Sequence, residues 1–301
     1  MPEYLYKLLT AKLNYDKVYE VRLRAGKPVT VNYAGRYYHA CEGGVSQETA
    51  GAYLCDGRLV ESVILNASNH SIYTVTNQLK EGYITVAGGI RLGICGEPVY
   101  GTDGEIRTFK NYSSVNIRIP HEVKNCALNA LDFVFSGRVA NTLVISPPGG
   151  GKTTFLRDMA RLLSDRAGLN ILVLDERGEL AASAGGAAQL DVGLYTDVLC
   201  NCGKKFGFEQ GIRTMRPDVI ITDELANATD AEAIVYAASC GVRVLASVHA
   251  YDQYDYAAKP DFEAAFKRRL FERYVVLSAR RGPGTYEGIY DAELNCLYYA
   301  K

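Results

Sequence analysis

The stretch VISPPGGGKTT, residues 144–154, constrains this chain more than any other part of the sequence. The apolar run 142–146 predicts a strand that enters the turn, and residues 153–167 predict a helix that leaves it. Three consecutive glycines allow backbone N–H groups to converge on phosphate oxygens, and the first turn of the helix adds its positive dipole end. This context favours a phosphate-binding loop over a glycine helix cap that only happens to carry a lysine.

The residues expected to surround a nucleotide form one continuous run: Ser146, Pro147, Pro148, Gly149, Gly150, Gly151, Lys152, Thr153 and Thr154. In the pattern G-x-x-x-x-G-K-[ST], the lysine reaches the β- and γ-phosphates and the following hydroxyl ligates magnesium. These are Lys152 and Thr153 here, whereas Ser146 stands where glycine is usual. ATP and Mg²⁺ are therefore the expected cofactors.

A second acidic feature follows in RPDVIITDEL, where the strand expected over 219–223 ends in two carboxylates. Asp223 is the candidate that holds magnesium through water, and Glu224 is the candidate that polarises the attacking water. An exposed acidic pair at a strand end is the alternative. The combination with the glycine-rich loop favours hydrolysis of a phosphoanhydride.

Two further strands are expected to end in polar residues at the same edge of a parallel sheet. LVLDERGEL delivers Asp175, Glu176 and Glu179, unless this is only a solvated charged turn. LASVHA delivers His249, which is either a sensor of the γ-phosphate or a structural histidine.

The two halves of the chain differ in pattern. Residues 125–301 alternate apolar strands with helices, which predicts an α/β domain with a mostly parallel sheet covered on both faces. Residues 1–124 predict an N-terminal α+β domain of short strands and turns. Its expected elements are strands at 19–23, 28–33 and 114–119, a helix over 48–67, and two or three strands within 82–101.

Charge and composition limit the partners. Lys plus Arg (33) nearly balance Asp plus Glu (34), so a nucleic-acid-coating protein is not expected. We see no secretory signal or membrane span, which predicts a cytosolic protein with at most peripheral membrane contact. The eight cysteines are then expected to be reduced thiols, and the close pair Cys200 and Cys202 supplies only half of a zinc ligand set.

Several blocks of sequence resemble the hexameric secretion ATPases of type II and type IV systems and, more closely, the stage III sporulation protein AA family of endospore-forming bacteria. They are VRLRAGKPVTV, SIYTVTNQLKEGYITVAGGIRLGICGE, NIRIP, SPPGGGKTTFLRD, LDERGEL, KKFGFEQGIRTMRPDVIITDEL and SVHA. The resemblance implies a RecA-like ATPase core joined to a mixed N-terminal domain. Ile90 departs from the pattern, because a histidine is expected at its position.

The resemblance also implies roles. Glu224 corresponds to the Walker B acid, Glu176 and Glu179 join the catalytic centre, and His249 belongs to the histidine box. The chain would form a homo-hexameric ring on the mother-cell side of the membrane facing the forespore, docked on membrane-embedded channel proteins.

In such a ring, an arginine from a neighbouring subunit can complete the catalytic centre. The candidates are Arg91, Arg118, Arg213 and Arg216. The expected function is ATP hydrolysis that energises or assembles a trans-membrane channel. A nucleic-acid motor and a nucleotide-bound scaffold with little turnover remain as alternatives.

Overall fold

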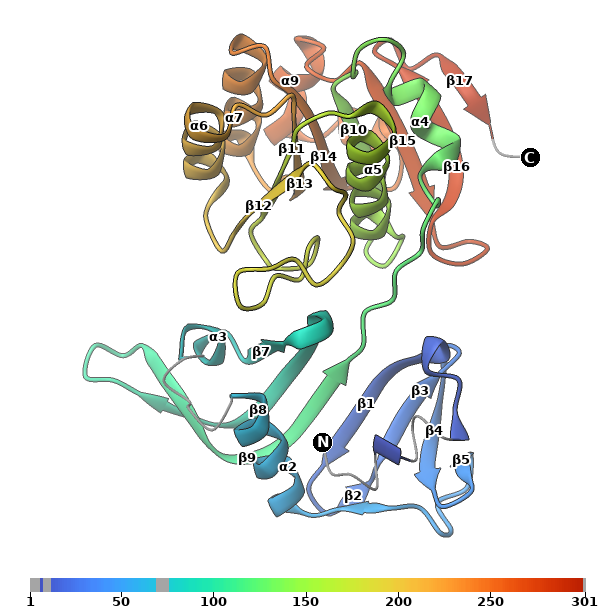
Figure 1. The fold of residues 1–301 in the computed structure, drawn as a ribbon, viewed down its shortest axis with the longest axis vertical. Helices are drawn as coiled ribbons and strands as arrows, with labels where there is room; N and C mark the ends of the chain where they lie inside the picture. Colours follow the sequence, from blue (N-terminus) through green and yellow to red (C-terminus); the bar gives the residue numbers. More distant parts are fainter. Residues whose placement is uncertain (1–5, 8–11, 69–75, 300–301) are drawn as a thin grey trace. The chain divides into compact units, whose positions relative to one another are not determined.

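The computed structural model describes residues 6–7, 12–68 and 76–299 (Figure 1). The beginning of the block that starts at Ser71 lies outside these residues. The chain divides into two compact units, Met1–His121 and Glu122–Lys301. The N-terminal unit has one hydrophobic core, and the second unit has two, one on each face of its sheet.

The N-terminal unit is built on a seven-stranded antiparallel sheet with the order β5-β4-β3-β1-β9-β8-β7. Its strands are β1 (Val18–Arg24), β3 (Thr30–Tyr33), β4 (Arg36–Cys41), β5 (Gly44–Ser46), β7 (Tyr83–Val86), β8 (Ile90–Tyr100) and β9 (Ile106–Arg118). Short elements complete the unit: η1 (Tyr15–Lys17), α3 (Thr76–Lys80) and η3 (Ala87–Gly89). Helix α2 (Gly57–Ala67) shares one core with the sheet, in which Val21, Leu23 and Val60 are fully buried.

The helix expected over 48–67 was wrong in its first half. Helix α2 begins at Gly57, where the Asp56 carboxylate accepts a hydrogen bond from the Leu59 N–H at 2.7 Å. Just before this cap, β6 (Leu54–Cys55) pairs with β2 (Lys27–Pro28), so the chain is extended there. An aspartate N-cap satisfies the free N–H groups of the first turn and therefore fixes where the helix starts.

The second unit contains an eight-stranded mixed sheet with the order β12-β11-β13-β14-β10-β15-β16-β17. Neighbours from β12 to β15 are parallel, and the last two pairings are antiparallel. The strands are β10 (Thr142–Ser146), β11 (Ile171–Asp175), β12 (Thr196–Cys200), β13 (Val219–Glu224), β14 (Arg243–His249), β15 (Arg273–Ser278), β16 (Thr285–Asp291) and β17 (Cys296–Tyr299). This agrees with the α/β class expected from the sequence.

Helices cover both faces of this sheet (Figure 1). Helices α4 (Leu128–Val134) and α5 (Lys152–Ala167) pack on one face. The other carries α6 (Lys204–Met215), α7 (Ala228–Ser239), α8 (Gln253–Ala257), η4 (Pro260–Phe262) and α9 (Glu263–Lys267). Strand β10 shows why its sequence is continuously apolar: Leu143 and Ile145 belong to one core and Val144 to the other.

The register of the parallel strands determines where the site lies. Ser146 at the end of β10 is the partner of His249 at the end of β14, and Glu224 at the end of β13 is the partner of Ser247. The carboxyl ends of the central strands therefore meet at one edge of the sheet, where ligands of such folds bind.

Candidate functional site

The glycine loop, residues 147–151, connects β10 to the first turn of α5. A Cβ atom on Gly150 would lie 1.7 Å from the Ser146 hydroxyl oxygen, so even alanine cannot be accommodated there without rearrangement. Gly151 has a φ of +93°, in the left-handed region that favours glycine. The Gly284 N–H donates to the Gly150 carbonyl at 3.0 Å, which holds the loop against the turn between β15 and β16.

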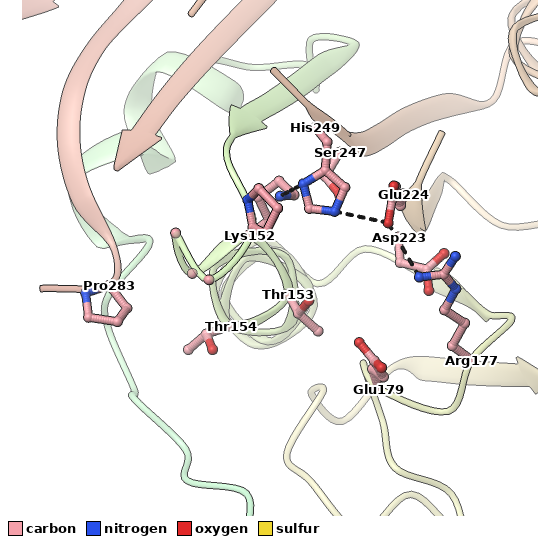
Figure 2. Close-up of a pocket in the computed structure, with 14 residues that line it drawn as sticks. Lys152, Thr153, Thr154, Arg177, Glu179, Asp223, Glu224, Ser247, His249 and Pro283 are labelled. Carbon is pink, nitrogen blue, oxygen red and sulfur yellow. Dashed lines mark hydrogen bonds and ion pairs between the residues drawn. The ribbon is translucent and has the colours of Figure 1, made fainter. Parts of the chain in front are cut away.

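A pocket of about 440 Å³ opens at the glycine loop (Figure 2). Of the predicted nucleotide-binding residues, Pro148 to Thr154 line it, whereas Ser146 and Pro147 do not. The remaining lining residues are Arg177, Glu179, Asp223, Glu224, Ser247, His249 and Pro283. The pocket thus gathers residues from the ends of β13 and β14, from the turns after β11 and β15, and from the glycine loop with the start of α5.

Lys152 is 7% exposed at the base of this pocket. Its ammonium donates to the carbonyl oxygens of Ser146 and Pro147, at 2.9 and 3.3 Å, and contacts His249 Nδ1 at 2.7 Å. Burial lowers the pKa of Lys152 to about 8, against the opposing effect of the Glu224 carboxylate. The lysine is therefore held by neutral groups, and its charge is poorly solvated.

His249 extends this contact to the carboxylate of Glu224. Its Nε2 lies 3.1 Å from Glu224 Oε2, and Arg177 Nη1 lies 3.4 Å from the same oxygen (Figure 2). Because the Lys152 ammonium can only donate, Nδ1 must accept, and the ring proton of a neutral imidazole is then on Nε2, facing Glu224. One chain of contacts therefore joins Lys152, His249, Glu224 and Arg177.

The turn that carries Glu179 into the pocket is fixed from inside the fold. The fully buried Asp175 carboxylate accepts the backbone N–H groups of Glu179, Leu180 and Ala181 at 2.8–3.0 Å. From α5, the buried guanidinium of Arg157 donates to the carbonyl oxygens of Leu180 and Glu179, at 2.6 and 2.7 Å. The sequence suggested Asp175 as a further acid at the edge of the sheet. In the structure, the Asp175 carboxylate holds this turn through the backbone N–H groups of the turn.

Glu176 lies outside the pocket lining and is bound instead to a lysine that the sequence reasoning missed. The Lys204 side chain is 5% exposed, and its Nζ lies 2.6 Å from Glu176 Oε2 and 3.5 Å from Asp223 Oδ1. Burial raises the pKa of Asp223 to about 6, and the Lys204 charge opposes that rise. Lysines on amphipathic helices are usually solvated. The burial of Lys204 could be recognised only from the parallel pairing of β11 with β13, which brings Glu176 and Asp223 close to one another.

The donor set fits a magnesium ion bound together with phosphate. The Thr153 hydroxyl and the Asp223 carboxylate line the same pocket, and oxygen donors of this kind suit Mg²⁺, which usually retains waters and phosphate ligands. Within the described part of the chain, no three His, Cys, Asp or Glu residues are grouped as a metal site. Cys200 and Cys202 are free thiols, and burial raises the pKa of Cys202.

The four candidates for an arginine that acts in trans lie outside the pocket lining of their own chain. Arg213 and Arg216 are exposed at the end of α6, outside the pocket lining. Arg91 and Arg118 face one another across the β8–β9 pair of the N-terminal unit, and the Arg91 guanidinium lies 3.8 Å from the centre of the Tyr83 ring. Arg177, which was not singled out from the sequence, is the arginine among the pocket-lining residues.

Among the described residues, no helix has the length and apolar character needed to cross a membrane.

The chain is similar to known proteins in sequence and in fold. Stage III sporulation protein AA of Bacillus subtilis (strain 168) is 36% identical over 286 residues, which cover 93% of this chain and 89% of that protein. Two solved structures share the fold. The pilus retraction motor PilT with bound ADP has a TM-score of 0.62 at 14% identity, and the match covers 92% of this chain and 78% of the PilT chain. The ATPase DotB of Legionella pneumophila has a TM-score of 0.59 at 13% identity, and the match covers 92% of this chain and 76% of the DotB chain.

Residues 3–297 match the family described as "Sporulation stage III, protein AA", and with the Bacillus subtilis relative this shows that the chain belongs to the stage III sporulation protein AA family.

Proposed function

We propose that this protein is a magnesium-dependent ATPase with a RecA-like P-loop core. The observation that carries the proposal is that Lys152 at the start of α5 and the pair Asp223 and Glu224 at the end of β13, two separate segments, line the same pocket. A buried ammonium, the N-terminus of a helix and two carboxylates at a pocket mouth suit a triphosphate and a divalent ion. The structural relative PilT was solved with bound ADP, which adds support.

Each residue of the pocket then has a role in hydrolysis. Lys152 and the N–H groups of the glycine loop bind phosphate oxygens, while the Thr153 hydroxyl and Asp223 would hold the metal ion. Bound magnesium supplies positive charge to the phosphate oxygens. Glu224 orients the attacking water and accepts its proton, and His249, hydrogen-bonded to Glu224, keeps that carboxylate aligned.

Two further predicted residues take supporting roles in this mechanism. Glu179 lines the pocket and can order water near the phosphates. Glu176 acts indirectly, because its contact with Lys204 places that cation next to Asp223.

In the cell, we infer that the chain forms a homo-hexameric ring that energises or assembles a trans-membrane channel during endospore formation. The family supports the link to sporulation, and the fold shared with a pilus retraction motor supports mechanical work. The ring would act in the mother-cell cytoplasm, at the inner face of the membrane, on membrane-embedded sporulation proteins. With a net charge of −1, nucleic acid is not an expected partner.

Phosphate release from MgATP, measured with the mass of the protein across a range of concentrations, tests this proposal. Lys152→Ala should lose nucleotide binding, and Glu224→Gln should bind nucleotide but release no phosphate. Absence of release by the wild type in assembled form, or full release by Glu224→Gln, would contradict the ATPase. Strong stimulation by DNA or RNA would instead indicate a nucleic-acid motor.

A further inference from the structure

One cation of the pocket has no role in the mechanism above. Arg177 follows β11 in the turn between Asp175 and Glu179, and its guanidinium faces Glu224 across the pocket mouth (Figure 2). It belongs to the same chain as the glycine loop. An arginine at this place is therefore available without a neighbouring subunit.

The backbone that carries Arg177 is fixed on both sides. Strand β11 precedes it, and the next residues are tied down by the three hydrogen bonds to Asp175 and the two from Arg157. Positioning groups are effective when their supporting shell is rigid, because little ordering then remains for the reactive complex. To reach a phosphate in the pocket, only the side chain of Arg177 has to move.

The contact between Arg177 and Glu224 is suited to exchange. The N–O distance is 3.4 Å, and the Arg177 side chain is 61% exposed, so the pair is loose and partly solvated. Such pairs contribute little free energy. The Glu224 oxygen also keeps its contact with His249 at 3.1 Å, and it is therefore not left without a donor when Arg177 leaves.

We propose that Arg177 is a catalytic arginine supplied in cis, which moves from Glu224 to the terminal phosphate of the bound nucleotide. This inference rests on the proposed ATPase. Water forms a new O–P bond to the γ-phosphorus while the bond from that phosphorus to the β–γ bridging oxygen breaks, and Glu224 takes the proton of the water. The Arg177 guanidinium neutralises charge on the γ-phosphate oxygens, and its departure from Glu224 frees the carboxylate to act as the base.

Nucleotide affinity provides a test that does not depend on turnover. In Arg177→Ala, a non-hydrolysable triphosphate with magnesium should bind about tenfold more weakly, the equivalent of one charge-assisted hydrogen bond, while ADP should bind as to the wild type. Arg177→Lys should retain part of the preference because it keeps the charge without the planar fork. Arg166→Ala, an exposed arginine in the last turn of α5, is the matched control. Equal loss for both nucleotides, or for neither, would overturn the assignment.

Turnover and subunit mixing distinguish an arginine in cis from one in trans. Arg177→Ala should lower kcat about a thousandfold with little change in ADP affinity. Co-expressed Arg177→Ala and Lys152→Ala chains, purified through two different tags, should stay inactive, because every site lacks either its arginine or its lysine. If mixing restores activity, Arg177 acts across the subunit interface and the cis proposal fails.

The outcomes also separate this inference from the proposed function. A wild type that binds neither nucleotide refutes both. A wild type that prefers the triphosphate through Arg177 but releases no phosphate refutes the ATPase and the catalytic role of Arg177, while its contact with the nucleotide stands. An active, strictly monomeric wild type supports the arginine in cis.

Discussion

Asp175→Asn tests the claim that the turn beside the pocket is fixed by one buried carboxylate. Oδ1 of Asp175 accepts from the N–H groups of Glu179 and Leu180, and Oδ2 accepts from the N–H of Ala181. Asparagine has nearly the same shape but one acceptor oxygen. If that oxygen serves Glu179 and Leu180, the new NH₂ group faces the Ala181 N–H, and two donors oppose one another.

The size of the effect follows from these bonds. A buried N–H left without an acceptor costs about 1–3 kcal/mol, and each of the two remaining bonds loses about 1 kcal/mol when its acceptor becomes neutral. The free energy of unfolding should therefore fall by about 3–5 kcal/mol. With a urea dependence of roughly 2–3 kcal/mol per molar, the unfolding midpoint should fall by more than about 1 M.

Urea unfolding followed by circular dichroism measures this midpoint. Because the chain has two compact units, hydrogen exchange should assign the change, with faster exchange appearing first in residues 176–190. Asp197→Asn, an exposed aspartate on the neighbouring strand β12, makes the same chemical change where no such bonds exist. If both variants unfold at the same urea concentration, the turn is not held by Asp175 and the rigid support inferred for Arg177 is wrong.

Three further outcomes are expected. Triphosphate affinity should be constant below pH 8 and should fall by up to tenfold per pH unit above it. The reason is that Lys152, whose pKa is lowered to about 8, must be protonated to bind the phosphate. Calorimetric titration between pH 6.5 and 9.5 checks this. Lys204→Met should lower the free energy of unfolding by about 3 kcal/mol at pH 8, since the buried, ionised Asp223 loses its cation. That deficit should shrink below pH 6, where Asp223 is protonated, as urea midpoints at pH 5 and pH 8 would show. Gly150→Ala should weaken nucleotide binding at least tenfold through its clash with the Ser146 hydroxyl, and adding Ser146→Gly should restore part of that affinity in an equilibrium binding assay.

Local pattern was sufficient where one strand or one motif decides the structure. Strand β10 begins and ends at the residues predicted, β11 ends at an acidic residue as expected, and the glycine loop lies between a strand and a helix. Their continuous apolar runs are fully buried, which is the situation that hydrophobic pattern reports best. Helix α6 and strand β12 were not predicted, because two glycines interrupt the helix and the strand is only partly apolar.

The parts of the site that depend on neighbouring strands were beyond the sequence. Nothing local distinguishes Lys204 from a solvated lysine or Arg177 from a charged residue in a turn. The parallel register of β11, β13 and β14 brings Arg177 to Glu224, and it brings Glu176 and Asp223 together where Lys204, at the start of α6, contacts both. The turn held by Asp175 and Arg157 carries Glu179 to the pocket lining, whereas Glu176 contacts Lys204 outside that lining.

A comparison of Lys152 with Lys204, both buried, shows how this pocket keeps a positive charge available. Lys204 is bound to carboxylates and is neutralised by them before any ligand arrives. In the described part of the chain, Lys152 is held only by carbonyl oxygens and a neutral imidazole, with Glu224 one histidine ring away. An incoming phosphate can therefore bind the Lys152 ammonium without breaking an ion pair, so no carboxylate is left as an uncompensated buried charge. Because Lys204 is already paired with Glu176 and Asp223, the Lys152 ammonium remains available to bind the anion.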